Sequence, residues 1–115
     1  MSSNYQHGHD AEEFAVKYLE KNGYRTLEIN WKTRWCEIDI ITSKDNCIFF
    51  IEVKYRRSSN NGTGLDYITP KKLKQMTFAA EMWIASHNWH GEYQLAAIEV
   101  GGNDFTVSNF VTDIS

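Results

Sequence analysis

Charged residues alternate with apolar residues in two short stretches of the chain, Glu-Ile-Asp-Ile-Ile at 37–41 and Phe-Ile-Glu-Val-Lys at 50–54. A period of two is typical of β-strands, because successive side chains point to opposite faces of a sheet. In each stretch, two charged residues therefore share one face of the predicted strand. These pairs are Glu37 with Asp39 and Glu52 with Lys54, and the opposite faces carry Cys36, Ile38, Ile40, Phe49, Ile51 and Val53.

The link between the two strands is rich in turn-forming residues and predicts a β-hairpin with Asp45 and Asn46 at its tip. Counting back from this turn gives three opposed pairs: Lys44 with Cys47, Asp39 with Glu52, and Glu37 with Lys54. An odd-length loop without a bulge would instead place the acids on opposite faces. Directly opposed like charges destabilise a pair of strands. A divalent cation between the two carboxylates would remove this repulsion.

The resulting pattern, D-x12-E-x-K, contains the groups that phosphodiester hydrolysis requires. Carboxylate oxygens suit Mg²⁺, and a nearby lysine can orient or deprotonate an attacking water and offset charge in the transition state. The alternative interpretation is an edge strand that carries charges for solubility, with Glu37 and Lys54 as a cross-strand ion pair. Short patterns of this kind recur by accident, so the pattern alone leaves both interpretations open.

The rest of the hydrophobic pattern predicts an α/β fold with the order helix, three strands, helix, two strands. The first helix is expected at 10–21, with Gly23 placed to end it, and the second begins at Thr69 with Pro70 in its first position. Strands are expected at 24–31, from about 36, from about 47, at 93–100 and at 105–111, and a loop rich in Ser, Asn and Gly at 58–64. This order favours a mixed sheet flanked by helices.

The composition of the 115 residues, 42% apolar and 14% aromatic, is sufficient for one globular domain over 1–115. No apolar run approaches the roughly 20 residues that span a bilayer, and the polar start lacks the features of a secretory signal. We therefore expect a cytoplasmic protein without a membrane partner. Cys36 and Cys47 do not oppose each other in the predicted register, which argues against a disulfide.

The net charge of −3 counts against nucleic-acid binding, which usually requires a basic surface. A bound cation would neutralise Asp39, Glu52 and a third candidate acid, Glu12, and the rest of the chain carries no net charge. The positive residues also cluster, at the end of the second acidic strand and at the start of the second helix. They are Lys54, Arg56, Arg57, Lys71, Lys72 and Lys74. Such clusters are commonly solvated faces, so they support nucleic-acid binding only because they adjoin the acids.

Two further residues have both a structural and a functional interpretation. Glu12 borders the apolar stripe of the first helix, one helical step from Ala15, so its side chain could reach over the sheet. A first-turn acid favoured by the helix dipole explains Glu12 equally well. Trp35 could stack on a nucleic-acid base or pack in the core, and both uses remain open.

The element order and the positions of the acids resemble the core of the PD-(D/E)xK nuclease superfamily. They are more closely similar to the YraN-like family, which has a Holliday-junction-resolvase-like fold. The motifs that carry the resemblance span about residues 8–100 and are Gly8-x3-Glu12-x2-Ala15-x2-Tyr18-Leu19-x3-Gly23-Tyr24, Asn30-Trp31, Glu37-Ile38-Asp39-Ile40-Ile41, Phe50-Ile51-Glu52-Val53-Lys54-x-Arg56, Gly62 and Thr69-Pro70-x-Lys72. The resemblance implies that Glu12, Asp39 and Glu52 bind metal and that Lys54 is the catalytic lysine.

Two positions depart from the family pattern. Trp35 and Cys36 stand where the family usually has two glycines, which makes the approach to the site bulkier. Gln94 stands where an aspartate tends to follow an aromatic residue, which removes a charge. Both departures bear on access of a substrate to the site.

The sequence therefore predicts a metal-dependent endonuclease that acts on branched or structured DNA. Its Mg²⁺ or Mn²⁺ ligands are Glu12, Asp39 and Glu52, Lys54 positions the attacking water, and Glu37 keeps Lys54 aimed. The residues expected to contact nucleic acid are Arg56, Arg57, Lys72 and Trp35. The alternative is a non-catalytic nucleic-acid-binding or protein-interaction module that retains the fold. The sequence leaves open whether the chain forms a homodimer, which symmetric cleavage of two strands would require.

Overall fold

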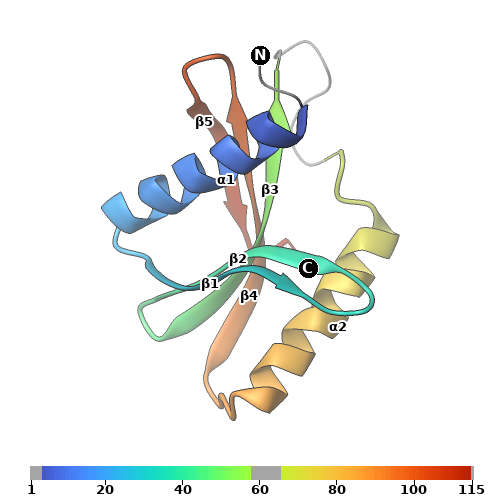
Figure 1. Cartoon of the computed structure of the whole chain (residues 1–115). Coiled ribbons are helices and arrows are strands. Elements are labelled where there is room, and N and C mark those ends of the chain that lie inside the picture. Colours follow the sequence, from blue (N-terminus) through green and yellow to red (C-terminus); the bar gives the residue numbers. More distant parts are fainter. Residues whose placement is uncertain (1–3, 58–65, 115) are drawn as a thin grey trace.

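The computed structural model describes residues 4–57 and 66–114, with side chains from residue 8 onward. It has an α/β fold in which a five-stranded mixed sheet lies between two helices, consistent with a restriction-endonuclease-like core (Figure 1). The elements are α1 (Asn4–Lys21), β1 (Arg25–Lys32), β2 (Glu37–Lys44), β3 (Cys47–Arg56), α2 (Pro70–Ser86), β4 (Glu92–Gly101) and β5 (Thr106–Thr112). This is the predicted order. The loop expected at 58–64 lies outside the described residues.

The strands follow one another in the sheet in sequence order, β1-β2-β3-β4-β5. Neighbouring strands are antiparallel except β3 and β4, which are parallel and are connected through α2. The edges of the sheet are therefore β1 and β5, whereas β2 and β3, which carry the acids, lie inside it. The alternative interpretation of these acids as solubilising charges on an edge strand is wrong.

The two helices cover opposite faces of the sheet (Figure 1), and each buries an apolar stripe against its face. On one face, Ala11, Ala15 and Leu19 of α1 are fully buried. On the other face, Met76, Ala79 and Ala80 of α2 are fully buried as well. The central run of β3, Ile48-Phe49-Phe50-Ile51, supplies residues to both clusters and is buried on both sides. Covering both faces explains why this strand is a continuous apolar run.

The ends of the helices follow the expected capping signals, with one difference. Gly23 has φ +89° and ends α1, while the Thr69 hydroxyl accepts a hydrogen bond from the Lys72 N–H, 3.1 Å away, at the start of α2. The helix α1, however, begins at Asn4 rather than near residue 10. Residues 4–9 lack an apolar stripe, so the pattern does not predict them as helical, although a nucleated helix gains a hydrogen bond with each added residue.

The predicted β2–β3 hairpin register is confirmed from the turn to Ile40. Lys44 pairs with Cys47, and the ladder continues to Ile40 opposite Ile51, so it ends before the expected pairs of Asp39 with Glu52 and Glu37 with Lys54. Asp45 and Asn46 at the tip both have positive φ, 51° and 66°, as in the type I′ turn, whose twist matches that of the strands.

The strict alternation expected at 36–40 is wrong at one point. Ile40 packs in the cluster that faces α1, but Ile38 packs in the cluster that faces α2, together with Cys36. The irregularity lies beside Asn30 of β1, which has φ +55° and stands between the pairs Ile29–Ile40 and Trp31–Ile38 of the β1–β2 register. Asparagine tolerates this left-handed conformation better than most residues, so it allows the local distortion.

Cys36 and Cys47 are both free. No described helix has the length and apolar character needed to span a membrane.

The hairpin turn generates a test of the fold. We expect Asn46→Val to lower the free energy of unfolding by about 1 kcal/mol, because a β-branched residue disfavours positive φ. Asn46→Gly should be at least as stable as wild type, because glycine adopts this conformation freely. Urea denaturation measures both, and equal loss of stability in the two variants would contradict the assigned turn.

Candidate functional site

Asp39 is a buried carboxylate at the point where β2 and β3 separate. Its side chain is 8% exposed, and its Oδ2 accepts a hydrogen bond from the Val53 N–H of β3 at 2.8 Å. The β2–β3 ladder ends one residue earlier, at Ile40 opposite Ile51, while β3 continues to pair with β4 as far as Arg56. The Asp39 side chain thus occupies the place of the next bond between the two backbones.

The surroundings of Asp39 favour its protonated form. Burial, followed by the charge of Glu52, raises the pKa of Asp39 to about 8 from an ordinary 3.8, although the Val53 N–H opposes the rise. Glu12 and Glu37 add to the rise through their charges. At neutral pH the ionised form is therefore costly unless a cation is near.

Glu52 on β3 has a cationic neighbour. Its Oε1 lies 3.5 Å from the Nζ of Lys72, in the first turn of α2. Burial raises the pKa of Glu52, while the charge and hydrogen bond of Lys72, and then the charge of Lys54, act in the opposite direction. Lys72 therefore offsets part of the negative charge of the site.

Glu12 reaches the same group of acids from α1. Burial, and then the charge of Glu37, raises the pKa of Glu12, and the charge of Glu52 adds to the rise. A hydrogen bond with the side chain of Asn30 acts in the opposite direction. The structure thus places the three predicted metal ligands, Glu12, Asp39 and Glu52, from α1, β2 and β3, within electrostatic range of one another.

The expected contact between Glu37 and Lys54 is not formed. Within the described parts of the chain, these two side chains make no ion pair, because the strands have separated before they reach this level. Glu37 instead adds negative charge close to Glu12 and Asp39. The Nζ of Lys54 lies 5.7 Å from the centre of the Tyr67 ring.

Tyr67 brings an unsatisfied polar group to this region. Its hydroxyl is buried and has no hydrogen-bond partner among the described residues. Burial, and then the charges of Glu52 and Glu99, raises its pKa. The neutral hydroxyl is a potential hydrogen-bond donor beside the acids.

Arg56 forms ion pairs with two carboxylates, Glu99 of β4 and Asp66 before α2. Glu99 is 7% exposed and also accepts a hydrogen bond from the Ser108 hydroxyl at 2.9 Å. This arrangement differs from the predicted phosphate contact, because binding of phosphate by Arg56 would require one of these ion pairs to open.

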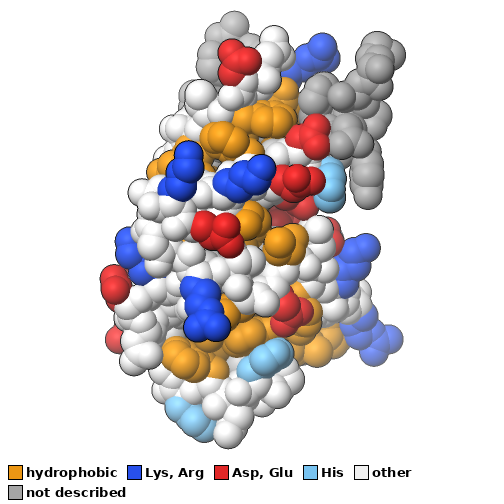
Figure 2. Space-filling model, turned by 60° about the vertical axis from the view of Figure 1, so that its left-hand side comes forward, with side chains coloured by type: hydrophobic (Ala, Val, Ile, Leu, Met, Phe, Trp, Pro, Cys, Tyr) orange, Lys and Arg blue, Asp and Glu red, His pale blue; other side chains and the backbone are white. Residues whose placement is uncertain are grey.

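The other predicted nucleic-acid contacts, Arg57, Lys72 and Trp35, differ in exposure. Arg57 is exposed, whereas Lys72 is partly buried beside Glu52. Trp35 is 46% exposed, which favours the surface interpretation over core packing. On the face shown in Figure 2, acidic and basic side chains are interspersed and no continuous basic surface is present.

The two departures from the family pattern occupy different places. Cys36 packs against α2, where its Sγ lies 3.6 Å from the backbone carbonyl oxygen of Gln75. Gln94 pairs with Phe49 in the β3–β4 register, whereas Glu52 pairs with Ala97. Three residues of strand, roughly 10 Å, therefore separate Gln94 from the level of Glu52. The Gln94 substitution lies away from the acids.

The three acids have the type of ligand atom that a hard divalent cation prefers, but their side chains do not converge on one point in the structure. Mg²⁺ and Mn²⁺ prefer oxygen ligands, and three mutually repelling carboxylates provide them. Among the described residues, however, no three His, Cys, Asp or Glu side chains converge closely enough to hold a metal ion. The Glu52 carboxylate lies beside the Lys72 ammonium group, and the Asp39 carboxylate accepts a hydrogen bond from the Val53 N–H. Metal binding would therefore require the side chains of Glu52 and Asp39 to turn.

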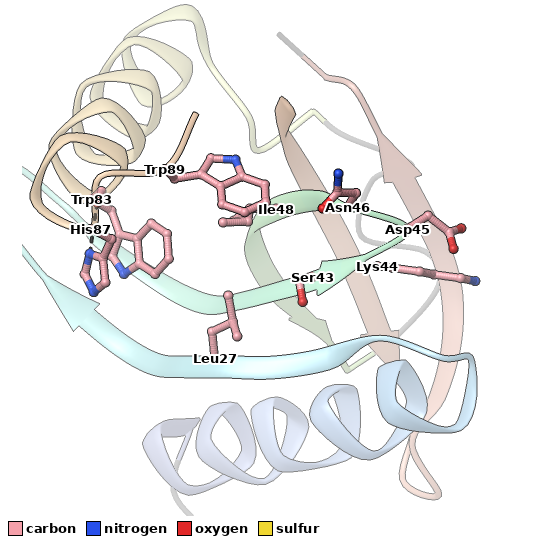
Figure 3. Close-up of a pocket in the computed structure, with 9 residues that line it drawn as sticks. All are labelled: Leu27, Ser43, Lys44, Asp45, Asn46, Ile48, Trp83, His87 and Trp89. Carbon is pink, nitrogen blue, oxygen red and sulfur yellow. Dashed lines mark hydrogen bonds between the residues drawn. The ribbon is translucent and has the colours of Figure 1, made fainter. Parts of the chain in front are cut away.

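A hollow of about 440 Å³ lies at the C-terminal end of α2, near the β2–β3 turn (Figure 3). The rings of Trp83 and His87 stack along its wall, with centroids 3.8 Å apart. Glu28 accepts a hydrogen bond from Trp83 Nε1 at 2.9 Å, and the backbone carbonyl of Trp83 lies 2.9 Å from His87 Nδ1. These contacts satisfy Trp83 Nε1 and His87 Nδ1 and indicate a structural role.

Sequence reasoning missed three polar residues near the acids: Asn30, Tyr67 and Glu99. Glu99 had a visible signal, because it is an acid within the apolar run of β4, like Glu52 in β3. Asn30 had a weaker one, as an asparagine inside a strand pattern. Tyr67 had none, because its position depends on how the residues before α2 pack.

Comparison with known proteins places these residues in a family. A family model described as "Uncharacterised protein family UPF0102" matches residues 11–100. The chain is 35% identical over 102 residues to a UPF0102 protein of Cytophaga hutchinsonii, covering 89% of this chain and 90% of the relative. It is 38% identical over 99 residues to one of Sulfurihydrogenibium sp. (85% and 86%), and 43% identical over 75 residues to one of Syntrophomonas wolfei (65% of each). These names state no activity.

The buried acids generate a prediction about stability. Between about pH 4 and 8 the folded protein keeps the Asp39 proton that the unfolded chain loses, so in chelator the stability due to this group falls as pH rises. Asp39→Asn keeps the acceptor for Val53 and removes the charge. We expect the variant to exceed wild type by about 1 kcal/mol at pH 8 and by less at pH 5. Thermal and urea denaturation measure this difference.

Two comparisons control the experiment. Asp39→Ala should lose stability, because it leaves the Val53 N–H without its acceptor. Mg²⁺ or Mn²⁺ should stabilise wild type more than Asp39→Asn, through binding to the folded state. Glu37→Gln should not destabilise, since Glu37 lies among acids rather than against Lys54. If Asp39→Asn melts below wild type in chelator at both pH values, the carboxylates do not repel one another as described.

Proposed function

The chain belongs to the uncharacterised protein family UPF0102, and we propose that it is a metal-dependent endonuclease that hydrolyses phosphodiester bonds in branched or structured DNA. The observation that carries the proposal is that three acids from three elements, Glu12, Asp39 and Glu52, lie near enough to affect one another's charge. Burial and neighbouring acids raise the pKa of each. Selection for stability alone would not gather like charges inside a sheet, so their presence favours a functional role.

The proposed roles follow from the position of each side chain. Asp39 of β2 and Glu52 of β3, together with Glu12 of α1, would hold Mg²⁺ or Mn²⁺. When bound, the ion supplies a Lewis acid that polarises the scissile phosphate and lowers the pKa of a coordinated water. Lys54, two residues after Glu52, would orient the attacking water and offset the negative charge that develops on the phosphoryl oxygens.

Lys72 has a proposed role that depends on what else is bound. In the metal-free protein it partly neutralises Glu52, at 3.5 Å. A divalent cation beside Glu52 would repel the Lys72 ammonium group. The ammonium group would then be available for a phosphate of the substrate. The same residue would thus stabilise the empty site and contact the DNA.

The second hypothesis, a non-catalytic nucleic-acid-binding module, is favoured by two observations. In the described residues no three candidate ligands converge, and the bulky Trp35-Cys36 replaces a glycine pair near the acids. Such a module should bind branched DNA equally well with metal or with chelator. Symmetric cleavage of two strands would require two copies of the site, so a homodimer belongs to the proposal only for that reaction.

The experiment that tests the proposal is a cleavage panel of linear, flapped and four-way DNA with Mg²⁺, Mn²⁺ or chelator. We expect metal-dependent nicking by wild type and at least about a hundredfold slower nicking by Lys54→Ala, because general acid–base and electrostatic assistance commonly contribute this much. Binding of the same DNA in chelator should change little. Gel analysis of end-labelled DNA measures cleavage, and fluorescence anisotropy measures binding.

Lys17→Ala is the matched control, because Lys17 is an exposed lysine on α1. It should cleave like wild type. Full activity of Lys54→Ala would refute the proposed site, and absence of cleavage by wild type on every substrate, with DNA binding unaffected by chelator, would favour the binding module.

The basic residues generate a separate prediction. Arg57→Gln should weaken binding to all DNA sequences alike and reduce the slope of log K against log salt by about one, since Arg57 is exposed at the end of β3. Arg56→Gln should instead lower the free energy of unfolding, because it leaves Glu99 buried without its ion pair. Salt titrations and urea denaturation of both variants distinguish the two roles. A reduced salt slope with unchanged stability for Arg56→Gln would reassign Arg56 to the DNA contact.

A further inference from the structure

Two exposed aromatic rings lie together on the surface where α2 begins. Trp35 is 46% exposed and Phe78 is 48% exposed, and their ring centroids are 4.5 Å apart with the planes inclined at 63°. They line a hollow of about 450 Å³, whose other lining residues are Lys71, Lys74 and Gln75. We call these five residues the aromatic hollow. Two large rings left this exposed side by side mark a candidate binding surface.

The charge around the aromatic hollow is positive, in contrast to the acids nearby. Lys71 and Lys74 line it, and the Cζ of Arg34 lies 5.6 Å from the centre of the Trp35 ring. None of its lining residues is acidic. In a chain with a net charge of −3, this local excess of positive charge favours a negatively charged ligand that also has flat apolar groups.

The aromatic hollow adjoins the acids through the chain and through α2. Trp35 lies two residues before Glu37, and Cys36 contacts the Gln75 carbonyl oxygen at 3.6 Å. On α2, Lys71 precedes Lys72, whose ammonium group lies 3.5 Å from Glu52. The aromatic hollow and the acids are therefore formed from neighbouring residues of the same two segments, the residues before β2 and the first turns of α2.

We propose that the aromatic hollow binds an unpaired strand of nucleic acid, with bases stacked on Trp35 and Phe78 and phosphates held by Lys71 and Lys74. This proposal rests on the proposed function, because the hollow is relevant to cleavage only if the nearby acids form a nuclease site. It specifies the substrate as a duplex that carries a single-stranded arm. Bases within a duplex are already stacked on each other, so only unpaired bases can present a face to the two rings.

Binding experiments in chelator test the proposal without cleavage. The probes are a blunt DNA duplex, the same duplex with an unpaired thymidine arm of about ten nucleotides, and the same arm built from abasic sites. Wild type should bind the thymidine arm more tightly than the abasic arm. Trp35→Ala and Phe78→Ala should each weaken binding of the thymidine arm about tenfold, as expected for loss of one stacked base, and should scarcely affect the blunt duplex or the abasic arm.

The lysines should behave differently from the rings. Lys71→Gln and Lys74→Gln should weaken binding of thymidine and abasic arms alike, and each should reduce the salt slope by roughly 0.7, the value for one contact to a single strand. Phe78→Tyr should restore binding, because it retains the ring. Met82→Ala, at an exposed apolar residue on α2 outside the hollow, should bind like wild type.

The outcomes separate this proposal from competing explanations. Equal affinity of wild type for the thymidine and abasic arms would overturn it, and so would equal losses on both arms for Trp35→Ala and Phe78→Ala. Loss of self-association in these variants, measured by sedimentation, with DNA binding unchanged would assign the rings to a protein contact and also overturn it. If Lys54→Ala cleaves normally while the arm preference depends on the rings, the proposed catalytic site fails and the arm-binding surface stands.

Discussion

The structure depends on one hydrogen bond between a side chain and a strand, from the Val53 N–H to the Asp39 carboxylate. A carboxylate can take this place only if β2 and β3 separate beyond Ile40 and Ile51. This separation opens the sheet between its two covered faces. It explains how Glu12 from α1 and Lys72 from α2, on helices that cover opposite faces, both act on Glu52. An unbroken ladder would keep these side chains apart.

Much of this arrangement could be predicted from the sequence because it depends on local rules. Period-two alternation located the acidic strands, and the Asp45-Asn46 turn fixed their register, since a two-residue turn leaves one pairing. Capping signals located the start of α2 and the end of α1. The local distortion at Asn30 and the change of face between Ile38 and Ile40 could not be predicted, because they result from accommodating one buried side chain among three strands.

Acids inside apolar runs also show where a sequence pattern stops being informative. Glu52 and Glu99 have the same signature. Glu99 pairs with Arg56 and accepts a hydrogen bond from Ser108, whereas Glu52 lies beside Lys72 and also near the acids Asp39 and Glu12. The difference depends on the parallel pairing of β3 with β4, which places Arg56 near the end of β4. Parallel pairing depends on the whole fold, so a structural acid and a candidate metal ligand look alike until the sheet is assembled.

The connection between β3 and β4 also affects the order in which the chain can assemble. The β2–β3 hairpin forms across a tight turn, whereas Lys72 lies on the helix that crosses from β3 to β4. Contacts close in sequence form with the smaller loss of chain entropy. The repulsion between Asp39 and Glu52 therefore arises before Lys72 can offset it. The early hairpin must be held together by its turn and by the apolar run of β3, so this run supports the kinetics of folding as well as the final core.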